Sequence, residues 1–222
     1  MSPVARWATF DCYGTLIDWE RGIMDAFAGL WPDADTRALL ATYHEIEPQV
    51  QTDSGAEYTR VLGDCLRSVA DRHGLELRDG DRDALSTSLP EWPPFSEVPD
   101  ALTELTARGW KLAILSNTDP PLLDASVRRI GVDVDLRITV AQSGSYKPAH
   151  GHWDTFFSAT DADRAGHVHV AASLYHDIAP CAELGLRAVW INRLDETTDL
   201  PVAAELTDLR TLPDVLDGLV AS

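Results

Sequence analysis

The sequence predicts an α/β fold: a doubly wound, Rossmann-like parallel sheet with an inserted all-helical cap. Two observations support this prediction. Short, almost continuously apolar runs alternate with helix-like segments over most of the chain, which is typical of a parallel sheet covered by helices on both faces. One long segment near the N-terminus instead shows helical periodicity and no convincing strand, which is typical of a separate helical unit.

Five apolar, β-prone runs are the expected strands. The first spans residues 7–10, directly before Asp11, and the others span residues 111–116, 137–141, 167–173 and 187–192. Helix-like segments lie between them, for example at residues 100–108, 121–130 and 177–184. A glycine follows each of these three segments, as expected at helix ends: Gly109, Gly131 and Gly185.

The helical insert covers residues 19–93. Its expected helices span residues 22–30, 35–47, 56–73 and 81–89, and a proline-rich run at residues 89–95 leads back to the sheet. We therefore expect an α/β core of residues 1–18 and 94–222 and a helical cap of residues 19–93.

The composition narrows the class of protein. The chain has 222 residues, of which 45% are hydrophobic and 24% charged, as in globular proteins. The net charge of −18 argues against binding to nucleic acids or anionic membranes, which need a basic face. No apolar run approaches the roughly 18 residues of a membrane span, and no secretory signal is visible. The three scattered cysteines favour reduced thiols in the cytoplasm over a disulfide framework.

Four groups of polar residues follow the expected strands in order, and we expect them to meet because reacting groups collect at the carboxyl ends of parallel strands. They are Asp11 with Thr15, Ser116 with Asn117, Lys147, and the segment Ser173–Asp177.

Each group suits a step of nucleophilic hydrolysis. Asp11 can attack an electrophilic centre and form a covalent ester, and Lys147 can keep Asp11 ionised. Hydrogen bonds from Thr15, Ser116 and Asn117 can orient Asp11 and stabilise charge. Asp177 can either activate the water that cleaves the ester or orient Lys147.

These four motifs together resemble the haloacid dehalogenase superfamily. Phosphatases of that superfamily carry a second acid where this chain has Tyr13, and they hold Mg²⁺ with an acid where it has Ala172. The run Asp-x-Tyr-Gly-Thr-Leu and the run Trp-Ile-Asn-Arg193 resemble the L-2-haloacid dehalogenase branch instead.

The resemblance implies a small-molecule hydrolase. It implies that a short 2-haloacid is dehalogenated without a cofactor, through an ester on Asp11, and it leaves room for a homodimer. Two alternatives stay open. One is an Mg²⁺-dependent small-molecule phosphatase with the metal on Asp11 and Asp177, and the other is a catalytically quiet protein of the same fold.

The expected substrate contacts depart from the family pattern. His44 stands near the place of the family's cap arginine, beside Glu45 and Glu47, which would repel a substrate carboxylate unless they point away. Trp153 stands in place of a tyrosine, and the last motif lacks the family's asparagine. The candidate substrate-binding residues are Tyr13, Cys12, Trp19, His44, Trp153, Ser173 and His176.

Several of these residues also have a structural interpretation. Tyr13, Trp19 and Trp153 can line a pocket or pack in the interior, and Ser173 can cap a helix. Cys12 suits a buried apolar place. His167 and His169 alternate on one expected strand, and we assign them structural or surface roles, because no cysteine or dense group of acids completes a zinc site with His176.

Overall fold

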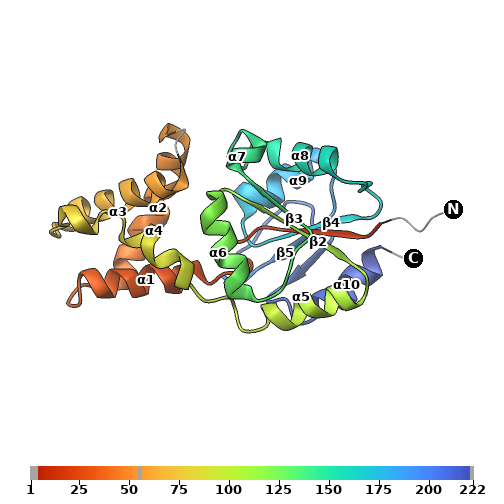
Figure 1. The fold of residues 1–222 in the computed structure, drawn as a ribbon, viewed down its shortest axis with the longest axis horizontal. Coiled ribbons are helices and arrows are strands. Elements are labelled where there is room, and N and C mark those ends of the chain that lie inside the picture. Colours follow the sequence, from red (N-terminus) through yellow and green to blue (C-terminus); the bar gives the residue numbers. More distant parts are fainter. Residues whose placement is uncertain (1–4, 55–56, 221–222) are drawn as a thin grey trace.

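The sheet at the centre of the molecule has six parallel strands, as the computed structural model shows for residues 5–54 and 57–220 (Figure 1). The strand order is β3-β2-β1-β4-β5-β6, so the chain starts in the middle, builds one side and then the other. The strands are β1 (Trp7–Phe10), β2 (Lys111–Ser116), β3 (Leu136–Thr139), β4 (His167–Ala171), β5 (Ala188–Ile191) and β6 (Ala204–Leu206). The predicted fold class is therefore confirmed.

Strands β1 and β4 lie side by side at the point where the strand order reverses. Trp7 pairs with Lys111 of β2 on one side and with His167 of β4 on the other. In a doubly wound sheet, the crevice beyond the carboxyl ends of these central strands is where ligands bind.

Two apolar layers cover the sheet, because neighbouring residues of a strand point to opposite faces. On β2, Leu112 and Ile114 belong to one buried cluster, and Ala113 and Leu115 belong to another. The first cluster includes residues of α5 (Val98–Ala107), α6 (Pro120–Ile130) and α10 (Leu212–Leu219). The second includes residues of α8 (Gly151–Ala159) and α9 (Ala179–Leu184). Short α7 (Val140–Ser143) follows β3.

The segment between β1 and α5 is helical, with no strand among its described residues. It contains α1 (Trp19–Leu30), α2 (Thr36–Ser54), α3 (Tyr58–His73), α4 (Ala84–Ser88) and the 3-10 turns η1 (Asp79–Asp81) and η2 (Leu89–Glu91). In Figure 1 these helices, which we call the cap, lie to one side of the sheet. The boundaries of the cap as a domain, residues 19–93, stay a prediction.

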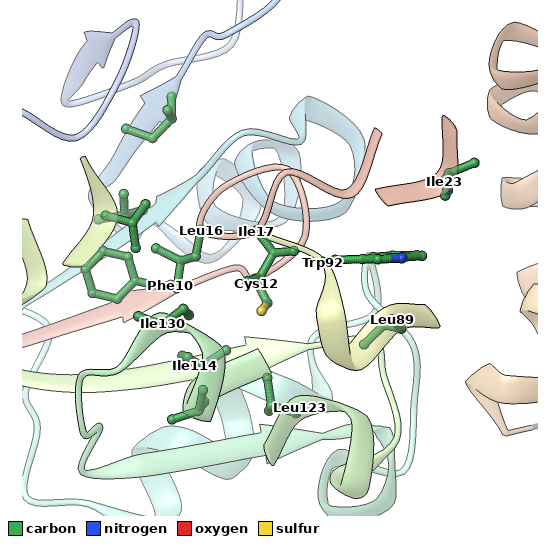
Figure 2. Packing of buried hydrophobic residues seen from close by; sticks show 14 of the residues in the cluster. Phe10, Cys12, Leu16, Ile17, Ile23, Leu89, Trp92, Ile114, Leu123 and Ile130 are labelled. Atoms are coloured by element: carbon green, nitrogen blue, oxygen red, sulfur yellow. The ribbon is translucent and has the colours of Figure 1, made fainter. Parts of the chain in front are cut away.

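The first apolar cluster runs without interruption from the sheet into the cap. Figure 2 shows Phe10 and Ile114 of the sheet in the same cluster as Ile23 of α1, with Ile17 and Trp92 among the residues between them. The close approach of α1 to Trp92 needs Gly22, because a Cβ atom there would lie 2.3 Å from the indole. Cap and sheet therefore share one hydrophobic core.

Some element boundaries differ from those expected. Helix α2 runs on through Pro48 to Ser54, and the expected start of the next helix at Ala56 lies outside the described residues. Strand β3 ends at Thr139, where its side chain and that of Gln142 form a capping box that starts α7. The helix expected from Asp177 begins earlier, as the π-helical turn η3 (Leu174–Ile178).

None of the helices in the described part of the chain is long and apolar enough to cross a membrane. Cys12, Cys65 and Cys181 are free and buried.

Candidate active site

Two carboxylates and one ammonium group meet at the carboxyl ends of the central strands. Asp11 follows β1, Asp177 lies in η3 just after β4, and Lys147 comes from the loop before α8. The Nζ of Lys147 donates to Asp11 Oδ1 at 2.8 Å and to Asp177 Oδ1 at 2.7 Å. It also donates to the carbonyl oxygen of Leu115 at 2.9 Å. These bonds use all three ammonium protons, so the position of Lys147 is fixed.

The charges of this group depend on one another. Burial works against the charge of Lys147, but Asp11 and Asp177 together outweigh it and raise the pKa of the ammonium above its ordinary value. Burial likewise favours the neutral form of Asp177, but Lys147 and the bond from His169 outweigh it and hold the pKa of that carboxyl below its ordinary range. Lys147 and Asp177 are thus both charged at neutral pH.

The loop after β1 holds Asp11 in place. The hydroxyl of Thr15 donates to Asp11 Oδ2 at 3.0 Å and accepts the N–H of Ala172 at 2.9 Å. Arg193 donates to the carbonyl oxygens of Gly14 at 3.2 Å and Thr15 at 2.9 Å, and its guanidinium lies 3.5 Å from the centre of the Phe95 ring. Arg193 therefore supports the loop that carries Asp11.

Asn117 contacts the backbone of Lys147. Its side-chain oxygen accepts the Lys147 N–H at 2.6 Å, and its amide donates to the Lys147 carbonyl at 3.0 Å. Its neighbour Ser116 is buried at the end of β2, where its carbonyl accepts a bond from His152 Nε2 at 3.1 Å. Asn117 thus fixes the lysine loop, whereas the sequence suggested that it would orient Asp11 directly.

A cavity of about 870 Å³ lies over these groups, between the strand ends and the cap. Asp11, Ser116, Asn117, Lys147 and Asp177 all line it. Of the six candidate catalytic residues, only Thr15 is absent from the lining; it is fully buried, and its hydroxyl donates to Asp11.

Five of the seven candidate substrate-binding residues also line the cavity: Tyr13, Trp19, His44, Ser173 and His176. His44 stacks on Trp19 with ring centres 5.1 Å apart, and its Nε2 lies 3.4 Å from Glu20. The Ser173 hydroxyl accepts the N–H of His176 at 3.0 Å, so Ser173 caps η3 and lines the cavity at the same time.

The structure corrects the prediction for the other two candidate substrate-binding residues. Cys12 and Trp153 are fully buried and lie outside the cavity lining. Cys12 belongs to the apolar cluster shown in Figure 2, and burial raises the pKa of its thiol well above the ordinary value. Trp153 packs beneath the sheet, where its ring meets that of His169 at 5.4 Å. Both side chains occupy apolar interior, so neither is placed to contact a substrate.

The sequence did not single out several cap residues that line the cavity, namely Met24, Gln51 and Tyr58. Gln51 donates to Glu47, which lies in the lining one helical turn earlier. Burial raises the pKa of Glu47 to about 7. Glu45, in contrast, points outward and pairs with Arg72 at 3.0 Å. Of the two glutamates expected to repel a substrate carboxylate, only Glu47 faces the cavity.

The two carboxylates that the phosphatase alternative assigns to Mg²⁺ both contact Lys147. The ammonium of Lys147 already bridges Asp11 and Asp177, and the described residues contain no group of three acids, histidines or cysteines that could hold a metal ion. Mg²⁺ takes about six oxygen ligands in octahedral geometry, of which several are usually waters and only one or two are protein carboxylates. Asp11 and Asp177, which would hold the metal only in the phosphatase alternative, are partners of a lysine in this structure.

Comparison with protein families gives a match at residues 5–162 to the model of haloacid dehalogenase-like hydrolases. The chain belongs to this family. A haloacid dehalogenase-like hydrolase is the class that the motifs at the strand ends predicted, so the predicted resemblance and the prediction of a hydrolase are confirmed.

Individual relatives include both dehalogenases and a phosphatase. An (S)-2-haloacid dehalogenase of Pseudomonas sp. strain YL is 29% identical, over 94% of this chain and 93% of the relative. A ribulose-1,5-bisphosphate 5-phosphatase of Halopiger xanaduensis is 28% identical, over 74% of this chain and 72% of the relative. The solved L-2-haloacid dehalogenase of Xanthobacter autotrophicus with chloropropionic acid covalently bound has the same fold, with a TM-score of 0.86 at 19% identity over 97% of this chain and 99% of that one.

Proposed function

We propose that this hydrolase removes the halogen of a short 2-haloacid by water, without a metal, through a covalent ester on Asp11. The arrangement that carries the proposal is Asp11 and Asp177 bridged by the buried ammonium of Lys147, with Tyr13 two residues after Asp11. The full-length similarity to an (S)-2-haloacid dehalogenase supports the choice of substrate. The free thiols also suit a reducing compartment, and we propose the cytoplasm.

In the first step, an oxygen of Asp11 attacks the carbon that bears the halogen. A new C–O bond forms, and the halide leaves with the electron pair of the C–halogen bond. Because a halide needs no proton to depart, no general acid is required. Lys147 and Thr15 hold the Asp11 carboxylate by hydrogen bonds of 2.8 and 3.0 Å, so the attacking group is oriented before substrate enters.

In the second step, water cleaves the ester. The water oxygen adds to the carboxyl carbon of Asp11, and its proton passes to Asp177. The bond between that carbon and the substrate oxygen then breaks, and the proton goes to the departing oxygen. The second proton of the water leaves the new carboxyl group to solvent, so the products are a 2-hydroxy acid, a proton and a restored Asp11 carboxylate that contains one oxygen atom from water. Asp177 Oδ2 has no hydrogen-bond partner within the described part of the chain, so it is available for this proton.

The phosphatase alternative needs a general acid near Asp11. Tyr13 is a poor candidate, because its hydroxyl is held by Ser126 at 3.0 Å and burial raises its pKa well above the ordinary value. Asp11 and Asp177, which would hold the Mg²⁺ on which such phosphatases rely, are both bonded to the ammonium of Lys147. The geometry therefore favours a leaving group that departs without protonation.

The test uses each enantiomer of 2-chloropropionate and 2-bromopropionate, together with monohaloacetates, in buffer with EDTA. Halide release is measured, and ¹⁸O from labelled water is followed into Asp11 under single-turnover conditions by mass spectrometry. We expect halide release and one ¹⁸O atom in the peptide that contains Asp11. Absence of both, with phosphate release from small phosphate esters in the presence of Mg²⁺, would show that the phosphatase alternative is right.

The variant Asp11→Asn separates the proposed nucleophile from the rest of the cavity. We expect kcat to fall on the order of 10⁴-fold or more, because removing a nucleophile abolishes the covalent route. Asp25→Asn is the matched control, since the side chain of Asp25 is 73% exposed on α1 and is not part of the cavity lining. Equal halide release by Asp11→Asn and Asp25→Asn would exclude Asp11 as the nucleophile.

A further inference from the structure

A chain of buried hydrogen bonds runs behind Asp177, between β1 and β4. His169 Nε2 lies 3.0 Å from Asp177 Oδ1, and His169 Nδ1 lies 2.8 Å from the hydroxyl of Thr9. The same hydroxyl lies 2.8 Å from His167 Nε2. Thr9, His167, His169 and Asp177 are all fully buried. Thr9, His167 and His169 take no part in the two reaction steps described above.

The direction of these bonds follows from the charge of Asp177. An ionised carboxylate only accepts, so His169 donates its Nε2–H to Asp177. The hydroxyl of Thr9 then donates to His169 Nδ1 and accepts the Nε2–H of His167. This arrangement leaves His167 Nδ1 as an acceptor without a partner in the described chain. The opposite direction would leave an unbonded N–H donor there, and such donors are rarely buried.

The bond from His169 makes the two oxygens of Asp177 different. Oδ1 accepts from both Lys147 and His169, at 2.7 and 3.0 Å. Oδ2 has no partner within the described residues. A carboxylate held through one oxygen presents the other in a fixed direction, which is what a general base needs in order to take a proton from water.

We propose that His169 is a positioning residue that holds Asp177 Oδ2 toward the Asp11 ester, with Thr9 and His167 fixing the orientation and tautomer of its ring. The inference rests on the proposed function. It assigns to His169, which the sequence placed among structural histidines, an effect on the second step alone.

The packing around His169 agrees with this role. The rings of Trp153 and His169 pack edge to face, with centres 5.4 Å apart and 71° between the planes, and this contact restricts the rotation of the imidazole. Burying two imidazoles and a hydroxyl in an apolar layer is costly, whereas an aliphatic side chain would fill the same place without that cost. A buried series of hydrogen bonds that ends on the carboxylate of Asp177 therefore indicates a role in the reaction.

The first test compares His169→Leu with His169→Gln. Leucine removes the donor, whereas the amide of glutamine places an N–H near the position of Nε2. With 2-bromopropionate under single-turnover conditions, we expect His169→Leu to form the Asp11 ester within about threefold of the wild-type rate. Its hydrolysis should be about 10- to 100-fold slower, part of the 10²–10⁴-fold contribution of a general base. The ester then accumulates in the intact-mass spectrum, and His169→Gln restores much of the hydrolysis rate.

The pH profile gives a readout that a packing role would not change. Losing a donor raises the pKa of Asp177, so the acid limb of ester hydrolysis should move to higher pH in His169→Leu. Besides His169, the titratable groups in the electrostatic surroundings of Asp177 are Lys147, Asp11, His152, His176 and Cys181. All of them are unchanged in the variant, so a shifted limb reports the His169 contact.

A second pair of variants covers the case in which His169→Leu does not fold. Thr9→Val has the shape of threonine without the hydroxyl that joins the two histidines, and Thr9→Ser keeps that hydroxyl. We expect Thr9→Val to slow ester hydrolysis severalfold and Thr9→Ser to stay near wild type. Equal ester hydrolysis by Thr9→Val and Thr9→Ser, or a wild-type hydrolysis rate in folded His169→Leu, overturns the proposal.

Nitrogen NMR of the histidine rings separates this inference from the proposed function, because it needs no turnover. We expect a His169 ring with its proton on Nε2, whose signal shifts in Asp177→Asn and loses its single tautomer in Thr9→Val. If haloacids are not turned over but these signals behave as expected, the proposed function fails and the positioning of Asp177 by His169 stands. A ring with its proton on Nδ1 alone refutes the positioning.

Discussion

Glu47 carries a buried carboxyl group at the cap side of the cavity, beside a substrate that we expect to be an anion. Its exposed fraction is 7%, and Gln51 donates a hydrogen bond to it. Burial favours the neutral acid more than this bond favours the carboxylate, so the pKa of Glu47 is about 7 against an ordinary 4.5. The protonated form of Glu47 leaves the cavity with one negative charge fewer. Deprotonation above neutral pH places a buried charge there and lowers the stability of the protein.

The variant Glu47→Gln should reveal this cost as a difference in pH dependence. A carboxyl whose folded pKa is raised contributes its full stability below pH 4.5 and loses it as pH rises through 7. Each tenfold change in acidity corresponds to about 1.4 kcal/mol, so the loss approaches roughly 3 kcal/mol. In urea unfolding, the free energy of unfolding of Glu47→Gln relative to that of the wild type should increase by about this amount between pH 5 and pH 8.5. Parallel stability curves for the two proteins would show that Glu47 is ionised throughout.

At the scale of elements, helix α1 sits against Trp92 at the place where the chain returns from the cap. The two come close enough that a Cβ on Gly22 would lie 2.3 Å from the indole, whereas a Cβ on Gly29 of the same helix would meet nothing within 4 Å. The packing of α1 against η2 therefore depends on one missing methyl group, within the core that cap and sheet share.

Gly22→Ala and Gly29→Ala form a matched pair for this contact. Alanine at position 22 must push α1 or Trp92 aside, and overpacking of this kind costs about 1–3 kcal/mol. Alanine at position 29 relieves the cost of a glycine inside a helix and should stabilise by up to about 1 kcal/mol. Thermal unfolding of both variants measures the difference. Similar melting temperatures for the two would mean that α1 does not pack tightly on Trp92.

Helix α3 is held at its start by a residue from the sheet side of the cavity. The side chain of its own N-cap residue, Glu57, makes no capping hydrogen bond to the helix. The carboxylate of Asp119, in the loop after β2, instead accepts the N–H groups of Tyr58 at 2.9 Å and Thr59 at 2.8 Å, together with the Thr59 hydroxyl at 2.8 Å. Asp119 lies two residues after Asn117, so this cap ties the helix to the loop that holds Lys147.

Asp119→Ala should therefore affect both stability and substrate binding. Loss of a helix cap costs about 0.5–2 kcal/mol, and the unheld start of α3 should raise KM more than it lowers kcat, because Tyr58 lines the cavity. Hydrogen exchange of the Tyr58 and Thr59 amides should become faster. Asp124→Ala, which removes only a surface pair with Arg137, is the control. Unchanged exchange at these two amides in Asp119→Ala would contradict the assigned cap.

On the scale of the whole molecule, the buried strands could be predicted from sequence because parallel strands are apolar along their length. The expected run at residues 111–116 matches β2 to the residue. Strand β6 (Ala204–Leu206) could not be predicted, because it is an edge strand of three residues that are at most half-buried. The end of β3 depends on the capping box between Thr139 and Gln142, a local signal that overrides the apolar run continuing to Ala141.

The meeting of Asp11, Lys147 and Asp177 could likewise be predicted, since each comes after a strand whose carboxyl end lies at the same edge of the sheet. The contacts that fix them depend on packing across the sheet, which no single segment encodes. Thr9 reads as an ordinary strand residue, yet its hydroxyl joins two histidines from the neighbouring strand. From the sequence, Trp153 is a candidate to line a pocket, yet on its helix it packs against His169 in the apolar layer on one face of the sheet.

The net charge of −18 should act on the rate at which an anionic substrate arrives. Acidic side chains line the cavity around Lys147, among them Asp18, Glu20 and Glu196. Lys147 itself is neutralised by Asp11 and Asp177, so a haloacid approaches against a negative field. Salt screens such fields over about 10 Å at 0.1 M.

We therefore expect kcat/KM for 2-chloropropionate to rise severalfold when potassium sulfate, which adds neither halide nor carboxylate, is increased from low ionic strength to about 0.15 M. The neutral amide of the same acid is the control, because an uncharged molecule does not feel the field, and any turnover of it should be independent of salt. A fall in kcat/KM for the acid with added salt would mean that a local positive field, and not the net charge of the molecule, guides the substrate to Asp11.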